Sequence, residues 1–453
     1  MAVPVGHNEM MTDNFLDSLE KIAERVQTTD YFKYFVSPSA RIVDELDTES
    51  QILRGDLPLK LVSRAQPGST IFILGGPGSG KTILWHMLTE AAIRCDPPLV
   101  PVRFNVHWLA KHETRQGLLH ATLAGLFTDQ QIGELDRERR LLLLIDGLNE
   151  IAYSTTITER ARTTVSDMID GPEHCPVIAT SRVPVPTNLR LPGSFKEQVE
   201  ILLKRFEDQQ VDELLHKHGL DVQCFHAYLG TARLEQLASN PHLLSMLLSL
   251  FEVAPEVPAP NSVVELFERF FEVKWQQFRD IIDRADVVRT PFVKALSTLA
   301  WHMQVHGKNS VAPAEWSDLL SPFADALQRD GIDQQMIIDR AHAYYVMELD
   351  EGSLQFVHER YQNHYAGHFL HELGEIPEAI WQLPQWEDTL AHLAGLCDEN
   401  KTRALLRAAI ERGRTALACK LAAANWGRLG EEQLDRLFVH VATCLYDRRT
   451  KRD

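Results

Sequence analysis

The sequence contains no Cys-x-x-Cys pair and no hydrophobic run long enough to cross a bilayer. The longest apolar candidate, Leu243 to Ala254, has about a dozen residues, whereas a spanning helix needs about 20. The start of the chain lacks the basic and apolar regions of a secretory signal. The scattered cysteines favour buried thiols in a reducing compartment over a disulfide framework or a metal site; they are Cys95, Cys175, Cys224, Cys397, Cys419 and Cys444. We therefore expect a cytoplasmic protein without a membrane span.

The sequence also has fewer positively charged residues than negatively charged ones. The chain has 46 Lys and Arg residues against 63 Asp and Glu residues, which gives a formal net charge of −17. An acidic field of this size opposes general binding to nucleic acid or to anionic lipid. With 44% hydrophobic and 24% charged residues, the composition excludes the disordered, collagen-like and disulfide-rich classes. A length of 453 residues predicts about three domains.

From residue 56 to residue 205, short apolar segments alternate with helical ones. Segments 82–94 and 157–170 have helical patterns, and the expected strands are Ile71–Leu74, Leu99–Val106, Leu141–Ile145, Val177–Thr180 and Gln198–Leu202. This alternation predicts an α/β domain, in which a parallel sheet has helices on both faces. Residues 141–145 are all aliphatic, as expected of a central strand that is buried on both sides.

The sequence after residue 205 is mainly helical. The clearest helical segments are Phe206–His218, Ala232–Ser239, His242–Phe251 and Val263–Phe278. Segments 344–349 and 354–357 flank the turn-like residues 350–353 and predict one β-hairpin, which among helices is typical of a winged-helix domain. We expect a helical domain over 206–282, a winged-helix domain over 283–375 and a short α-helical C-terminal segment over 376–453.

Residues 1–55 precede the expected sheet domain as an N-terminal helical segment. Phe15, Leu19, Ile22 and Val26 repeat at helical spacing and give this segment one apolar stripe. Two interpretations stay open. The stripe either docks a partner, which would make the segment an adaptor, or packs against its own domain.

A phosphate-binding pattern follows the first expected strand. Residues 75–82 read Gly75-Gly76-Pro77-Gly78-Ser79-Gly80-Lys81-Thr82 and match G-x-x-x-x-G-K-[ST], with an expected helix directly after them. The glycines let backbone N–H groups converge on phosphate oxygens, and the helix N-terminus adds a favourable dipole. Lys81 is expected to contact the β- and γ-phosphates, and the Thr82 hydroxyl to coordinate Mg²⁺.

Two further strand ends carry residues that suit nucleotide hydrolysis. Asp146 follows the aliphatic strand and is expected to hold Mg²⁺ through the water shell of the ion. Glu150 comes shortly after it and could orient or deprotonate the attacking water. Arg182 follows the strand over 177–180, so it is expected at the sheet edge where ligands bind. There it either contacts the γ-phosphate or is an ordinary exposed arginine.

The order of these motifs resembles the NACHT family, which comprises signal-transducing P-loop NTPases of the AAA+-related STAND class. Over about residues 55 to 375, the resemblance is carried by GGPGSGKT, LLLLIDGLNE, VIATSR, Leu237-Ala238-Ser239-Asn240-Pro241 and Phe356-Val357-His358. The sequence contains neither an Asn-Lys-x-Asp guanine motif nor a Leu-Ser-Gly-Gly-Gln transporter motif. Together with the habit of the family, this favours ATP and ADP as the nucleotides.

The resemblance implies roles for two residues outside the sheet domain. Pro241 would pack on the adenine, and His358 would contact the β-phosphate from the winged helix. The plainer alternatives are that Pro241 starts a helix and that His358 is a half-buried strand residue. The family usually has a second Asp where this chain has Asn149, so the resemblance does not fix the hydrolysis rate.

By this resemblance, the sequence predicts an ATP/ADP-switched signalling NTPase with Mg²⁺ as cofactor. ADP would hold a closed state, ATP exchange would permit opening and self-oligomerisation, and slow hydrolysis would reset the switch. Defence or regulatory signalling would then pass through a separate effector or sensor protein, because the flanking segments are short. Two other functions stay open: a continuously cycling remodelling ATPase, and a binding module whose nucleotide is purely structural.

Overall fold

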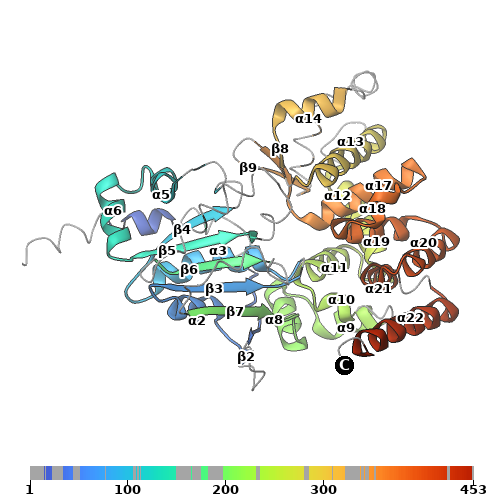
Figure 1. The fold of residues 1–453 in the computed structure, drawn as a ribbon, viewed down its shortest axis with the longest axis horizontal. Coiled ribbons are helices and arrows are strands. Elements are labelled where there is room, and N and C mark those ends of the chain that lie inside the picture. Colours follow the sequence, from blue (N-terminus) through green and yellow to red (C-terminus); the bar gives the residue numbers. More distant parts are fainter. Residues whose placement is uncertain are drawn as a thin grey trace, which may run out of the picture. The chain divides into compact units, whose positions relative to one another are not determined.

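The computed structural model describes residues 15, 17–22, 34–43, 52–76, 78–105, 109, 112, 114–148, 165, 175–181, 197–230, 235–279, 285–308, 310–321, 337, 341, 346–350, 353–425 and 429–450 (Figure 1). The chain divides into two compact units. The first comprises Met1–Val222 and Ala238–His242, and the second comprises Gln223–Leu237 and Leu243–Asp453. Each unit is described by itself.

The first unit is built on a seven-stranded sheet with the order β2-β1-β7-β3-β6-β5-β4. Its parallel part consists of β3 (Ser69–Leu74), β4 (Val100–Asn105), β5 (Leu141–Asp146), β6 (Val177–Ser181) and β7 (Glu197–Leu203). These are the strands expected from the sequence, with ends that differ by one or two residues. The prediction of an α/β fold with a parallel sheet is therefore confirmed for these five strands.

Helices cover both faces of this sheet. Successive strand residues point to opposite sides, so an apolar strand has two apolar faces, and both have to be buried. In β3, Phe72 and Leu74 belong to one core and Ile71 and Ile73 to the other. The first core is covered by α5 (Arg115–Leu123) and α6 (Asp129–Arg137), and the second by α2 (Leu57–Arg64) and α3 (Lys81–Arg94). The long aliphatic run in β5 is buried on both sides.

The N-terminal segment contains strands that the sequence analysis did not predict. β1 (Ala40–Val43) pairs antiparallel with β7, and β2 (Ile52–Leu53) pairs with β1 at the edge of the sheet. The helical stripe is described in part: Leu19 and Ile22 are buried in the first core, and Phe15 packs against it. This packing favours the interpretation that the stripe covers its own domain.

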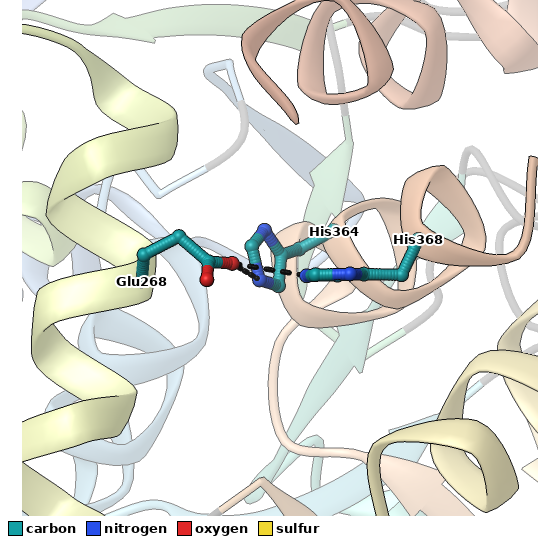
Figure 2. Close-up of side chains that lie close together, drawn as sticks. All are labelled: Glu268, His364 and His368. Carbon is teal, nitrogen blue, oxygen red and sulfur yellow. Dashed lines mark hydrogen bonds and ion pairs between the residues drawn. The ribbon is translucent and has the colours of Figure 1, made fainter. Parts of the chain in front are cut away.

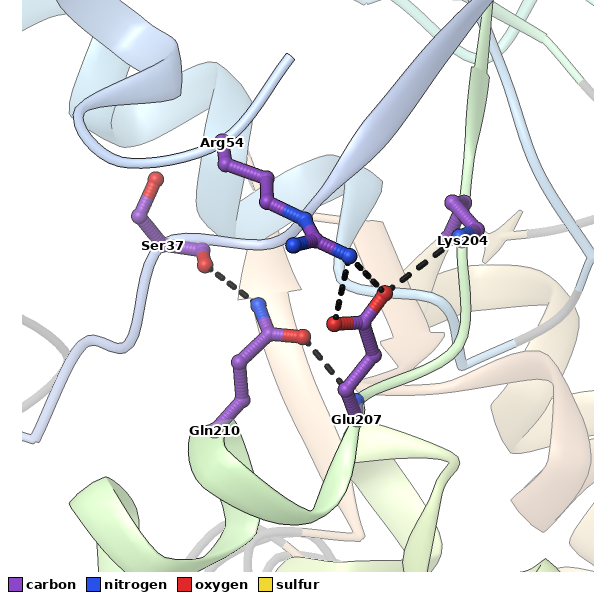
Figure 3. A network of polar contacts seen from close by, with 5 residues as sticks. All are labelled: Ser37, Arg54, Lys204, Glu207 and Gln210. Carbon is purple, nitrogen blue, oxygen red and sulfur yellow. Dashed lines mark hydrogen bonds and ion pairs between the residues drawn. The ribbon is translucent and has the colours of Figure 1, made fainter. Parts of the chain in front are cut away.

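A polar network ties the N-terminal segment to the start of α8 (Asp208–His218) (Figure 3). Glu207 accepts hydrogen bonds from Arg54 at 3.2 Å and from Lys204 at 3.3 Å. Gln210 completes a capping box with Glu207 and donates to the carbonyl of Ser37 at 2.6 Å. Accordingly α8 belongs to the first unit, although the sequence analysis placed it after the boundary at residue 205.

The second unit is mainly helical, with a small three-stranded sheet in the order β8-β10-β9. The strands are β8 (Ser310–Val311), β9 (Met347–Asp350) and β10 (Ser353–Phe356). The expected β-hairpin is therefore present. Three helices extend over a unit boundary, namely α9 (Val222–Gly230), α10 (Glu235–Ala238) and α11 (Pro241–Val253). The helices that follow are α12 (Val263–Arg279), α13 (Ala285–His306), α14 (Pro313–Leu320), α17 (Glu359–Leu373), α18 (Glu378–Trp381), α19 (Glu387–Leu396), α20 (Glu399–Glu411), α21 (Thr415–Ala424) and α22 (Glu431–Thr450).

Helix α17 lies at the centre of this unit and packs on both α13 and α19. Its buried polar residues are paired: Gln362 donates to Gln304 of α13 at 2.9 Å, and Asn363 accepts from Thr389 of α19 at 2.8 Å. These bonds fix the register of three helices, because a buried amide without a partner would be destabilising. Within the described residues, no helix is both long and apolar enough to span a membrane.

Candidate functional site

The predicted phosphate loop connects β3 to α3 in the first unit. Its backbone needs glycine at two described positions, since Gly78 has a φ of 74° and Gly80 a φ of 87°, where other residues are strained. The ammonium of Lys81 folds back over the loop and donates to the carbonyls of Gly75 at 2.7 Å and Gly76 at 3.1 Å. The lysine is thus held above the loop by the backbone.

The shape of this loop fits a bound phosphate. Among the described residues, a Cβ placed at Gly76 or Gly80 would meet no heavy atom within 4 Å, so space is open at both positions. The buried hydroxyl of Ser79 has no hydrogen-bond partner among the described residues. Helix α3 begins at Lys81 and has Gly80 as its N-cap, without a side-chain cap. Its first N–H groups can therefore bind an anion with the help of the helix dipole.

The two residues predicted to hold Mg²⁺ lie together. Thr82 at the start of α3 donates to Oδ2 of Asp146 at 3.0 Å, and Thr180 of β6 donates to Oδ1 of the same carboxylate. The N–H of Gly147 in turn donates to the Thr180 hydroxyl at 3.0 Å. A fixed carboxylate beside a hydroxyl is an oxygen ligand set of the kind that Mg²⁺ prefers.

The segment Ser239–His242 packs against the phosphate loop. The N–H of His242 points to the carbonyl of Gly78 at 3.4 Å, and a Cβ on Gly78 would lie 2.7 Å from Oδ1 of Asn240. The N–H of Phe206, just after β7, donates to the carbonyl of Ser239 at 2.8 Å. Pro241 is the first residue of α11, so the residue predicted to contact the adenine lies in the chain segment that touches the loop.

The sequence analysis did not select Arg103, which interacts with Asp146, or His86, which contacts Arg103. Arg103 of β4 contacts Nδ1 of His86 at 2.9 Å and lies over the ring of Trp85 at 4.0 Å. Burial lowers the pKa of Arg103 to about 10, although the charge of Asp146 acts in the opposite direction. Burial and the charge of Arg103 lower the pKa of His86 to about 3. The only signal in the sequence is an arginine within an otherwise apolar strand.

Three of the predicted site residues lie outside the described residues: Pro77, Glu150 and Arg182. The described chain stops at Leu148 after β5, two residues before Glu150, and at Ser181 in β6, directly before Arg182. Ser181 accepts from the N–H of Gly75 at 3.2 Å, so the carboxyl end of β6 adjoins the phosphate loop. The roles predicted for Glu150 and Arg182 remain predictions.

His358 lies in the second unit, between β10 and α17. It is the N-cap of α17, and its Nδ1 accepts a hydrogen bond from the N–H of Arg360 at 3.0 Å. This bond places the ring proton on Nε2 in the neutral form, which leaves Nε2 as a donor. The predicted contact between His358 and a phosphate remains a prediction.

Comparison with known proteins gives one family and several structures of low similarity. The sequence profile of the NACHT domain family matches residues 69–221. No curated protein matches the chain as a relative. A Walker-type ATPase of Pyrococcus abyssi has 11% sequence identity and a TM-score of 0.34 over 73% of this chain and 98% of that chain. A STAND protein with a tetratricopeptide-repeat sensor from Pyrococcus horikoshii has 12% identity and a TM-score of 0.37 over 86% and 54%. Cdc6p from Pyrobaculum aerophilum has 14% identity and a TM-score of 0.28 over 70% and 94%.

The matched range agrees with the structure at both of its ends. It begins at the first residue of β3 and ends three residues after α8, so it includes the five parallel strands, the phosphate loop and Asp146. It also includes the helix that the polar network ties to the first unit. Residues 69–221 are therefore a NACHT domain, the nucleotide-binding domain of a P-loop NTPase.

Proposed function

We propose that this chain is an ATP/ADP-switched signalling NTPase, closed with ADP and able to open and self-oligomerise after exchange for ATP. The observation that carries the proposal is the contact between Gly78 of the phosphate loop and the segment Ser239–His242. Residues 238–242 lie in the first unit, whereas the chain before and after them belongs to the second. A ligand that changed the contact between the loop and this segment would therefore act on a chain segment that leads directly into the second unit.

The residues around the loop suit the handling of a nucleotide with Mg²⁺. Lys81 is positioned to donate to phosphate oxygens from its place above the loop, in exchange for the carbonyls of Gly75 and Gly76. Thr82 and Asp146 would hold Mg²⁺, with Asp146 oriented by Thr180. Mg²⁺, when bound, neutralises charge on the phosphates. Glu150 is proposed to orient the attacking water, and Arg182 to contact the γ-phosphate.

The proposed domain layout keeps the winged-helix range 283–375 and the C-terminal range 376–453 expected from the sequence, and it assigns α8 to the NTPase domain that precedes the helical domain. The order α13, β8, α14, β9, β10 in the second unit supports a winged-helix domain over residues 283–375. We propose that its residue His358 donates to the β-phosphate in the closed state and that Pro241 packs on the adenine. Slow hydrolysis would reset the switch, and signalling in defence or regulation would require a separate effector or sensor protein.

The first experiment is to denature freshly purified protein and to measure which nucleotide is released and in what amount. The switch predicts close to one ADP per chain, exchanging slowly in the native protein. His358→Ala should then accelerate ADP release, while His371→Ala on the exposed side of α17 should leave it unchanged. An empty site that binds and turns over ATP rapidly would contradict the switch and would favour the cycling remodelling ATPase.

A further inference from the structure

A cluster of three potential metal ligands lies in the second unit, far from the phosphate loop in the sequence (Figure 2). Glu268 belongs to α12, and His364 and His368 belong to α17. The spacing of four residues places both histidines on one face of the helix. Their Nε2 atoms approach the same oxygen, Oε1 of Glu268, at 3.1 Å from His364 and 2.9 Å from His368.

The ionised carboxylate of Glu268 and the neutral ring of His364 are forms that can bind a metal ion. His364 is 1% exposed, and burial lowers its pKa to about 4 against the opposing hydrogen bond to Glu268, so the imidazole is neutral at neutral pH. Partial burial raises the pKa of Glu268, but the hydrogen bonds from the two histidines outweigh it and hold the pKa below its usual range. A carboxylate and a neutral imidazole are both metal ligands. Each histidine coordinates the ion through Nε2 once the proton that it donates to Glu268 has left or moved to Nδ1.

The distances suit a first-row metal ion after a small adjustment. Neighbouring ligands of a tetrahedral Zn²⁺ lie about 3.3 Å apart, given bonds of about 2.0–2.1 Å. The two nitrogen–oxygen distances are within a few tenths of an ångström of this value, and all three ligand atoms lie within 4.8 Å of one another. His364 is fixed by burial, whereas the side chains of His368 and Glu268 are 24% and 45% exposed and can turn toward an ion.

A cavity adjoins the three ligands. It has a volume of about 60 Å³ and is lined by all of them and by aromatic side chains that include Phe271 and Tyr365. This is room for at least one water molecule. Zinc sites with three protein ligands commonly keep a further position for water or another small ligand.

We propose that Glu268, His364 and His368 form a binding site for Zn²⁺ or another divalent first-row metal ion, with its remaining position directed into the cavity. Lys274 and Arg289 also line this cavity, and Arg289 pairs with Glu272 at 2.6 Å. Their positive charges oppose a bare cation and favour an anion as the additional ligand. The site therefore binds with moderate affinity and gains affinity when chloride or a carboxylate is present.

The bound ion would join two helices that the chain separates by residues 280–358. Glu268 and His368 are 100 residues apart in the sequence. A metal that crosslinks α12 to α17 stabilises the second unit, because binding to the folded state alone shifts the unfolding equilibrium. With free ion at about 100 times the dissociation constant, the melting temperature of the full chain should rise by roughly 5–10 °C.

The test uses the full chain, freed of metal with EDTA, dialysed and titrated with Co²⁺ as a spectroscopic substitute for Zn²⁺. We expect visible absorption that saturates at one Co²⁺ per chain and is displaced by Zn²⁺. His368→Gln and Glu268→Gln should weaken binding at least tenfold and remove the thermal shift. The chain has 19 histidines, so the matched control is His371→Gln, an exposed residue of the same helix that should change neither.

A ligand-retaining variant distinguishes loss of the site from loss of the fold. His368→Cys keeps a metal ligand at the same position and should add a sulfur-to-cobalt charge-transfer band that neither the wild type nor His371→Cys shows. The proposal is overturned if the wild type binds no Co²⁺ at micromolar concentration. It is equally overturned if His368→Gln and His371→Gln bind alike, or if His368→Cys binds without the new band. Because these readouts do not involve nucleotide, they are independent of the proposed switch.

Discussion

Replacement of Gly78 by alanine tests whether the segment Ser239–His242 depends on the shape of the phosphate loop. Gly78 has a φ of 74°, and an added Cβ would lie 2.7 Å from Oδ1 of Asn240 and 3.0 Å from Cβ of His242. Alanine therefore meets two obstacles. Its backbone is strained at a positive φ, and its methyl group occupies space that the packed segment already fills.

The costs of backbone strain and of the displaced segment can be separated with a control variant. A left-handed backbone costs a residue with a Cβ about 1–2 kcal/mol. Forcing an extra carbon into a packed contact costs about 1–3 kcal/mol more. Gly125 supplies the matched control, because it has a φ of 79° in the same unit but, among the described residues, no atom within 4 Å of an added Cβ. Gly125→Ala should therefore lower the free energy of unfolding through backbone strain alone. Gly78→Ala should lower it through backbone strain and through displacement of the segment Ser239–His242.

The assay combines unfolding with nucleotide affinity. Gly78→Ala should lower the free energy of unfolding by about 1–3 kcal/mol more than Gly125→Ala does, and ADP affinity should fall about tenfold or more only for Gly78→Ala. In the Gly78→Ala background, Asn240→Ala removes the amide that lies closest and should restore about 1 kcal/mol. Equal losses for the two glycine variants, or no coupling between positions 78 and 240, would refute the reasoning.

Three further predictions follow from the first unit. Lys81→Ala should reduce nucleotide affinity about 10- to 100-fold, measured with a fluorescent ADP analogue, because charge-assisted hydrogen bonds contribute about 1.5–3 kcal/mol each; unchanged affinity would remove the lysine from the site. Asp146→Asn should lower Mg²⁺-dependent hydrolysis at least tenfold, as expected when a charged oxygen ligand is lost, while nucleotide still binds without Mg²⁺; full activity would exclude Asp146 as the metal residue. The pKa of His86 is lowered to about 3 in the folded protein. Between about pH 6.5 and pH 3, the imidazole of His86 therefore takes up a proton in the unfolded chain but not in the folded one. The free energy of unfolding should fall with decreasing pH in this range, by up to about 1.4 kcal/mol per pH unit. His86→Gln should flatten this slope in urea unfolding measured at successive pH values, and an unchanged slope would contradict the assignment.

The strands and helices that could be predicted are those whose own residues carry the signal. Residues 141–145 had to be a buried strand because they are aliphatic on both sides of the pleat. By contrast β2 is a two-residue edge strand and β1 is its four-residue neighbour. The apolar side chains of Ile52 and Val43 are exposed, so neither strand alternates buried apolar residues with exposed polar ones. Helix α8 starts at Asp208 because Glu207 is its N-cap, with the N–H of Glu207 donating to Oε1 of Gln210 at 3.0 Å. The expected start at Phe206 did not take this contact into account.

The candidate site also contains parts that the sequence reveals and parts that it does not. The phosphate loop is visible in the sequence because its glycines, lysine and threonine are consecutive. The contact of Gly78 with Asn240 joins segments that are far apart in the chain, and no local sequence pattern predicts it. The same is true of Glu268 with His364 and His368, where only the helical spacing of the two histidines is a local signal.

The contact between loop and segment also limits how a nucleotide could operate the proposed switch. Residues 238–242 belong to the first unit, while the chain before and after them belongs to the second. The bond from the N–H of His242 to the carbonyl of Gly78 is long, at 3.4 Å, and contributes little by itself. To move a two-state equilibrium from 1:99 to 99:1 requires about 5.5 kcal/mol, the sum of roughly two or three charge-assisted hydrogen bonds. A γ-phosphate must therefore change several contacts at once, and Asn240→Ala alone should shift the population of open chains without inverting it. A fully open protein after this single change would mean that the closed state is held elsewhere.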